Sequence, residues 1–104
     1  NNLAWILAMA PDPEIRNPAR AVRLAREAVL ELRGDYQAWH TLAEAYYAAG
    51  RYDRALGAAE TTWQLVQLAD VAETAPFRAL LTRCREAQRT GRTAETEQNA
   101  HGTQ

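Results

Sequence analysis

Few side chains in this sequence are spaced for chemistry, and the clearest pair is His40 and Glu44. One helical turn apart, they would share one face of a helix and could offer two ligands to a zinc ion. Two further ligands are not evident nearby, so no metal site is predicted. We expect the pair to be solvated or to line a groove.

The single cysteine, Cys84, could act as a nucleophile only with a base beside it. It shares helical spacing with Phe77, Leu80 and Leu81, which favours a small buried side chain. The chain contains no serine and no lysine, which removes serine nucleophiles and Schiff-base lysines. No glycine-rich phosphate loop, HExxH or CxxC motif occurs. The sequence therefore predicts that the chain is not an enzyme and uses no cofactor.

The charge pattern gives no reason to expect nucleic acid or an anionic membrane as a partner. Twelve basic and thirteen acidic side chains leave a net charge of −1. One basic run could touch phosphates, and it consists of Arg16, Arg20, Arg23 and Arg26. Glu27 and Glu31 interrupt this run and no aromatic residues interleave with it, so a solvated helix face is the expectation.

The sequence favours the cytoplasm without excluding other compartments. No segment reaches the roughly 20 apolar residues that span a bilayer, and the opening residues lack the basic region of a signal peptide. We expect these opening residues to be part of the fold. A single cysteine fits a reducing compartment, while a secreted location stays open.

Helical periodicity dominates the chain and predicts an all-α fold. Trp39, Leu42 and Tyr46 follow the spacing of one helical stripe between an N-cap at Asp35 and a stop at Gly50. The same kind of pattern elsewhere gives helices at about 2–10, 18–32, 35–50, 52–67 and 74–90, the last of them ending at Gly91. The short link at Gly50, Arg51 and Tyr52 makes the third and fourth of these helices antiparallel neighbours.

Internal repetition relates the first two hairpins at one constant offset, the distance in sequence from Trp5 to Trp39. The same offset joins Ala21 to Ala55, Ala25 to Ala59, Val29 to Trp63, and Leu32 to Val66. With Trp39, Leu42, Ala43, Tyr46, Tyr47, Gly50, Tyr52, Asp53 and Ala55, the second hairpin resembles the tetratricopeptide repeat. The opening hairpin resembles the C-terminal repeats of longer bacterial arrays of this family.

The resemblance implies an α–α superhelix of about two repeats with a C-terminal capping helix. Its domain spans 1–90, with repeat 1 at about 2–34, repeat 2 at about 35–68 and the capping helix at about 74–90; a flexible tail follows at 91–104. On the outer face of the capping helix we place Arg78, Arg83, Arg85, Glu86 and Arg89. Members of the family are protein-interaction scaffolds, so the resemblance implies binding of a peptide or helix in a concave groove.

The groove is expected on the helix from Asp35 to Gly50. Because Trp39, Leu42, Ala43 and Tyr46 face the paired helix, the concave side is left to Gln37, His40, Thr41, Glu44 and Tyr47. Glu44 would repel a carboxylate and no groove arginine is expected, which favours a basic or neutral segment as ligand.

The opening helix predicts a second kind of contact. Trp5, Ala8 and Met9 can face its own hairpin, which leaves a stacking edge made of Leu3, Ile6, Leu7 and Ala10. This edge is expected to pack on a preceding repeat or on a second copy of the chain. The alternative to a binding module is therefore a structural terminal or oligomerisation segment of a longer array. An unrecognised enzyme or a regulatory domain remains a third class.

Overall fold

The computed structural model describes the backbone of residues 2–102 and the side chains of residues 3–91. Over this range the chain is entirely helical and has no strand, which confirms the predicted all-α class. The helices are α1 (Asn2–Met9), α2 (Pro18–Glu31), α3 (Tyr36–Ala48), α4 (Tyr52–Leu68) and α5 (Ala75–Gly102). The starts of α1 and α3 are separated by the same offset as the starts of α2 and α4, and this is the offset from Trp5 to Trp39. Helix α5 breaks this spacing because it begins later after α3 than the offset requires.

Local capping explains where the middle helices begin. The side chain of Asn17 accepts a hydrogen bond from the backbone N–H of Arg20 at 3.1 Å, and Pro18 occupies the first turn of α2, where its missing N–H costs little. The side chain of Asp35 accepts from the N–H of Gln37 at 2.8 Å and so caps α3. Both caps satisfy backbone donors that have no partner within the helix.

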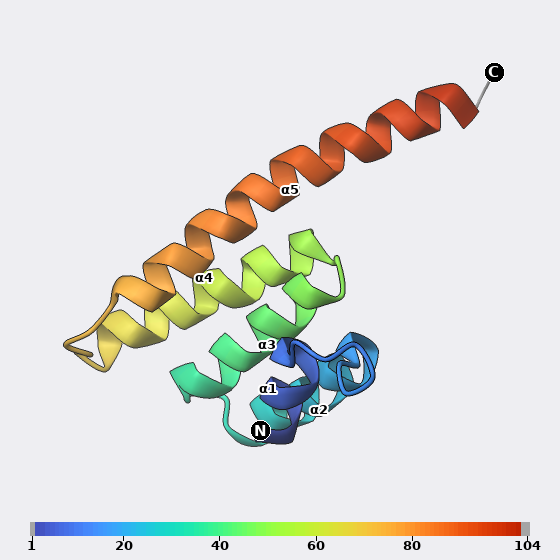
Figure 1. The fold of residues 1–104 in the computed structure, drawn as a ribbon. Helices are drawn as coiled ribbons and strands as arrows, with labels where there is room; N and C mark the ends of the chain where they lie inside the picture. The colour runs from blue at the N-terminus through green and yellow to red at the C-terminus, as the bar shows by residue number, and fades with distance from the viewer. Residues whose placement is uncertain (1, 103–104) are drawn as a thin grey trace.

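Helix α3 is the central element of the fold (Figure 1). It packs on α1 and α2 on one side and on α4 and α5 on the other. Helices α2 and α4 both pack on α3, but their backbones do not approach each other among the described residues. Helix α5 lies along α4 and extends past it, as Figure 1 shows.

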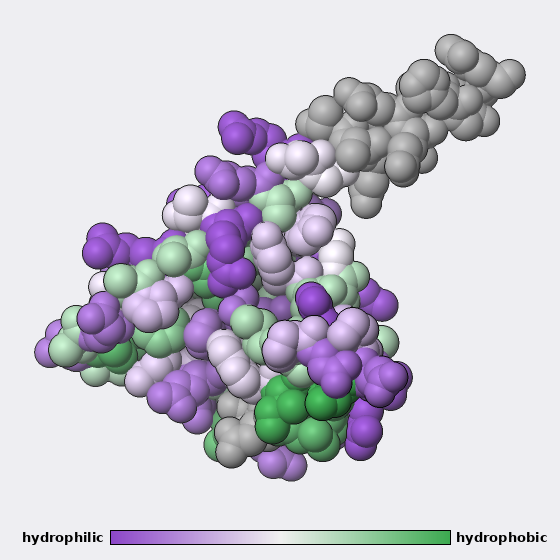
Figure 2. Space-filling view, viewed as in Figure 1, coloured by the Kyte–Doolittle hydropathy of each residue, from purple (hydrophilic) through white to green (hydrophobic). Residues whose placement is uncertain are grey.

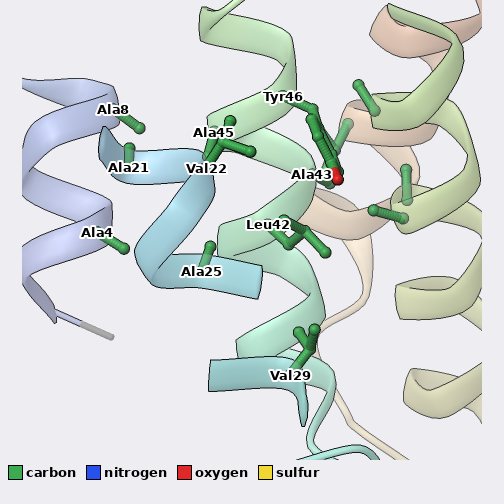
Figure 3. Packing of buried hydrophobic residues seen from close by; sticks show 14 of the residues in the cluster. Ala4, Ala8, Ala21, Val22, Ala25, Val29, Leu42, Ala43, Ala45 and Tyr46 are labelled. Carbon is green, nitrogen blue, oxygen red and sulfur yellow. The ribbon is translucent and has the colours of Figure 1, made fainter. Parts of the chain in front are cut away.

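Alanine dominates the contacts between these helices. Figure 3 shows Ala4 and Ala8 of α1 pointing toward α2, where Ala21 and Ala25 lie, and all four are at most 1% exposed. Ala55 of α4 is also fully buried. Side chains this small let helix axes approach closely, so burial here comes from many modest contacts and few large residues.

Helix α5 does not end at Gly91, so the predicted end of this helix is wrong. Its hydrogen-bonded backbone continues to Gly102. Gly91 has a different role: a Cβ atom there would meet the ring of Tyr52 at 3.0 Å, so glycine allows α5 to pass close to the start of α4. A glycine inside a helix costs about 1 kcal/mol relative to alanine, which weakens a helix without ending it. The predicted flexibility of 91–104 stays a prediction.

Candidate functional site

Three aromatic side chains form a row across three helices. The ring of His40 on α3 lies 5.3 Å from that of Trp5 on α1 and 5.1 Å from that of Phe77 on α5, measured between centroids. Tyr36 extends the row because its ring meets Phe77 edge-on at 5.5 Å. We call Trp5, His40 and Phe77 the aromatic row. Its members are only partly buried, and Trp5 is 36% exposed.

An ion pair lies one helical turn further along α3. Arg83 of α5 donates to the carboxylate of Glu44 at 2.9 Å, and Glu44 is only 5% exposed whereas the Arg83 side chain is 45% exposed. The guanidinium carbon of Arg83 also lies 5.1 Å from the centre of the Tyr47 ring, a cation–π arrangement. The predicted place of Arg83 on the outer face of α5 is therefore wrong. Leu80 and Cys84 are buried, and Arg83 is adjacent to that stripe and turns inward to the carboxylate.

The predicted groove residues do not share one exposed surface. Gln37 is exposed, and His40 and Tyr47 are half-buried. Thr41 and Glu44 are buried; the Thr41 hydroxyl donates to the carbonyl of Gln37 at 3.0 Å. Arg83 supplies the groove arginine that the sequence did not predict, so the argument against acidic ligands from an uncompensated Glu44 no longer holds.

The electrostatics of His40 reflect its position between the rings. Burial lowers its pKa, Glu44 acts in the opposite direction, and Arg83 lowers it further. The Glu44 carboxylate is already bound to Arg83. No group of three potential metal ligands lies around this pair or elsewhere within the described residues.

Cys84 lies in the core, where the helical stripe predicted it. It is fully buried, and burial raises the pKa of its thiol to about 11, although Arg83 acts in the opposite direction. The thiol is therefore protonated at neutral pH, and the reactive thiolate form is scarce.

The stacking edge is only partly where the sequence placed it. Leu3 and Ile6 are about half exposed, at 47% and 51%. Leu7 faces inward and is 7% exposed, whereas Met9, expected to face its hairpin, is 43% exposed. Ala10 is half-buried. The exposed apolar face of α1 therefore consists of Leu3, Ile6 and Met9; Figure 2 shows strongly hydrophobic side chains gathered over this part of the molecule.

Sequence reasoning missed Trp5, Phe77 and Arg83 as members of the site. The repeat could not place α5, because the segment that joins α4 to α5 is longer than the constant offset allows. A usable signal was the spacing of Arg83, which follows Leu80 by three residues and therefore shares a side of α5 with that buried side chain.

Comparison with known proteins gives no family assignment: no family model, curated protein or solved structure matches this chain. Across the described residues, no helix combines the length and apolar character needed to cross a membrane.

Proposed function

We propose that this chain is a protein-interaction scaffold that binds a peptide or helix along α1, α3 and α5. The observation that carries this proposal is the aromatic row, because partly exposed rings from three helices give a ligand one continuous surface. Aromatic side chains are enriched at the centres of protein interfaces, where they bury much apolar area and lose little entropy.

Several further features support a scaffold of the tetratricopeptide type. The starts of the first four helices repeat at one constant offset, and α3 packs against both helices of the hairpin before it. Arg83 contacts Tyr47 and compensates Glu44, so this carboxylate no longer argues against a ligand that carries a negative charge. Gln37 is exposed on α3, one helical turn before His40, and extends the surface along α3.

Site-specific photo-crosslinking tests this proposal. A photoreactive amino acid at Gln37 should form a discrete adduct with a partner protein in cells that express the full chain. The matched control carries the same group at Gln64, which is also exposed but lies on α4. Adducts at neither position, or the same adducts at both, would contradict binding at the aromatic row.

A second candidate function is a structural or oligomerisation segment. The exposed apolar face of α1 favours it, because Leu3, Ile6 and Met9 are neighbours on a helix and each has about half of its surface exposed. Another repeat of a longer chain or a second copy would cover this face. Sedimentation velocity of the chain shows whether it associates with a second copy or stays monomeric.

A further inference from the structure

A groove lies between α2 and α4, separate from the aromatic row. Helix α3 packs on both α2 and α4, while the backbones of these two stay apart within the described chain, so α3 forms the floor of the groove. The groove encloses a cleft of about 380 Å³. Its apolar and aromatic lining includes Val29, Leu30, Trp39, Leu42, Tyr46 and Ala58.

A second cleft of about 580 Å³ continues the groove toward the start of α2. Its apolar surface comes from α2 and from the end of α3, through Pro18, Ala19, Val22, Ala48 and Ala49. Arg26 lines both clefts, so the two adjoin at this side chain.

Four arginines line the groove, and none of their guanidinium groups has a partner among the described residues. Arg23 and Arg26 project from α2, Arg51 follows the turn after α3, and Arg54 lies on α4; all four are exposed. Within the part of the chain that the structure describes, these side chains make no hydrogen bond or salt bridge. No acidic residue of that part lines either cleft.

The acidic residues closest in sequence lie toward other helices. Glu27 and Glu31, which interrupt the basic run in the sequence, line a separate cleft between α1 and α2. Asp53 lines neither cleft of the groove; it accepts a hydrogen bond from Gln88 of α5 at 2.7 Å and lines a separate cleft that Arg51 and Arg54 also border. On α2, Arg23 and Arg26 therefore line the groove, whereas Glu27 and Glu31 line the cleft toward α1.

We infer that this arginine groove is a docking surface for an acidic amphipathic helix. Charge complementarity requires a ligand with several carboxylates, and arginine binds carboxylates with paired hydrogen bonds. The apolar floor requires aliphatic or aromatic anchors on the same ligand, and Leu30, which is 65% exposed, would be covered by them. A long polyanion fits less well, because the chain carries a net charge of −1 and its carboxylates lie outside the groove.

The test uses a labelled peptide of about four helical turns. It carries Leu and Phe at positions i, i+3, i+4 and i+7 and Glu at the positions between them. Fluorescence anisotropy should show binding that weakens as salt is added. The double substitution Arg26→Glu and Arg54→Glu should raise Kd by about tenfold or more, and Leu30→Glu should raise it independently.

The matched control is Arg78→Glu with Arg85→Glu, which makes the same change in charge on α5 at two exposed arginines. This variant should leave Kd within about twofold. Equal loss in both double variants would overturn the proposal, since binding would then follow net charge. So would equal binding of a peptide with Lys in place of Glu, of a polyglutamate peptide without anchors, or of a short DNA duplex.

The proposals for the aromatic row and for the arginine groove can be contradicted separately. The absence of an adduct at Gln37 would contradict binding at the aromatic row alone. A peptide Kd that does not change on substitution of Arg26, Arg54 or Leu30 would contradict binding in the arginine groove alone.

Discussion

Arg83 compensates a carboxylate that the fold has largely removed from water. Glu44 is 5% exposed and has this single ion-pair partner among the described residues. Removing one member of such a pair leaves a buried charge without compensation. The consequence is asymmetric, because Arg83 is 45% exposed and can be solvated alone, whereas Glu44 cannot.

We therefore expect Arg83→Ala to lower the free energy of unfolding by about 2 kcal/mol. Adding Glu44→Gln to that variant should restore part of the loss, because the neutral amide is less costly to bury. Urea denaturation measures both, with Arg85→Ala on the same helix as the control. If Arg83→Ala and Arg85→Ala unfolded at the same urea concentration, the ion pair would contribute nothing measurable.

The same ion pair makes Glu44 unsuitable as a position for testing the aromatic row by mutation. Changing Glu44 to arginine would place a second cation beside Arg83 and bury it. Stability and binding would then change together, which is why exposed Gln37 is the better probe of the aromatic row.

His40 should make stability depend on pH. Its pKa in the folded state is lowered, first by burial and then by Arg83, with Glu44 opposing. The unfolded chain, with a pKa of 6.5, therefore binds the proton more readily. The contribution of neutral His40 to the free energy of unfolding is fully present above pH 6.5. It decreases as the pH falls below that value, until His40 is protonated in the folded state as well.

The comparison with His40→Gln isolates this contribution, because all other titrating groups are common to both proteins. We expect the melting temperature of the parent to fall relative to that of His40→Gln as the pH is lowered from about 7.5 to about 5. Thermal unfolding of both proteins over this range measures the difference. A difference between parent and variant that stays constant over this range would mean that His40 titrates alike in both states.

At the scale of elements, α3 and α4 end with the same backbone motif but different residues. Gly50 has φ +77°, and the N–H of Arg51 reaches the carbonyl of Tyr46 at 2.9 Å. Asp70 has φ +54°, and the N–H of Val71 reaches the carbonyl of Val66 at 3.3 Å. A side chain in this left-handed region is strained, and a carboxylate at a helix C-terminus opposes the helix dipole.

Gly50→Ala should therefore cost about 1 kcal/mol, and Asp70→Gly should stabilise by about 0.5 kcal/mol. Gly34→Ala is the control, because Gly34 has no positive φ and no atom within 4 Å of an added Cβ. Calorimetric melting of the three variants measures the differences. Equal melting temperatures for Gly50→Ala and Gly34→Ala would contradict the left-handed cap.

The residues at the helix ends show why the positions of most helices could be predicted from the sequence, whereas contacts between helices could not. Caps such as Asn17, Asp35 and Gly50 act within a few residues, so the sequence alone located them. Gly91 looked like a further stop, yet its meaning depends on Tyr52, which lies far earlier in the chain at the start of α4. Local sequence cannot distinguish a glycine that ends a helix from one that allows a neighbour to approach.

Which site residues are buried also depends on packing between helices that are distant in the sequence. In the predicted α3 stripe, Leu42, Ala43 and Tyr46 are buried, and Trp39 is half-buried. Glu44, by contrast, is buried beside Arg83 of α5, and the repeat offset did not place this helix because α5 begins later than that offset requires. Leu7 and Met9 exchanged their expected places, since a short helix with almost no polar side chains has no pattern that fixes its rotation.

At the scale of the whole molecule, its surfaces divide by chemistry. The aromatic row crosses α1, α3 and α5, the arginine groove lies between α2 and α4, and the exposed apolar face belongs to α1. The aromatic row and the arginine groove share no residue, so substitutions can address these two surfaces separately. On α1, Trp5 of the row and Met9 of the apolar face are one helical turn apart, so those two surfaces adjoin.

The α1 face provides the last prediction. Leu3, Ile6 and Met9 are about half exposed, and covering them with a second apolar surface would be favourable by roughly 25 cal/mol per Å² of apolar area. The 104-residue chain should therefore self-associate in sedimentation velocity as its concentration rises. Leu3→Glu with Ile6→Glu should abolish this association and leave the helical circular dichroism intact, because both side chains point away from the core. Leu68→Glu is the control, since Leu68 is 83% exposed at the C-terminal end of α4, a helix that does not pack on α1 within the described residues. A parent chain that stays monomeric at high concentration, or association that Leu68→Glu removes equally well, would leave this face without a role in self-association.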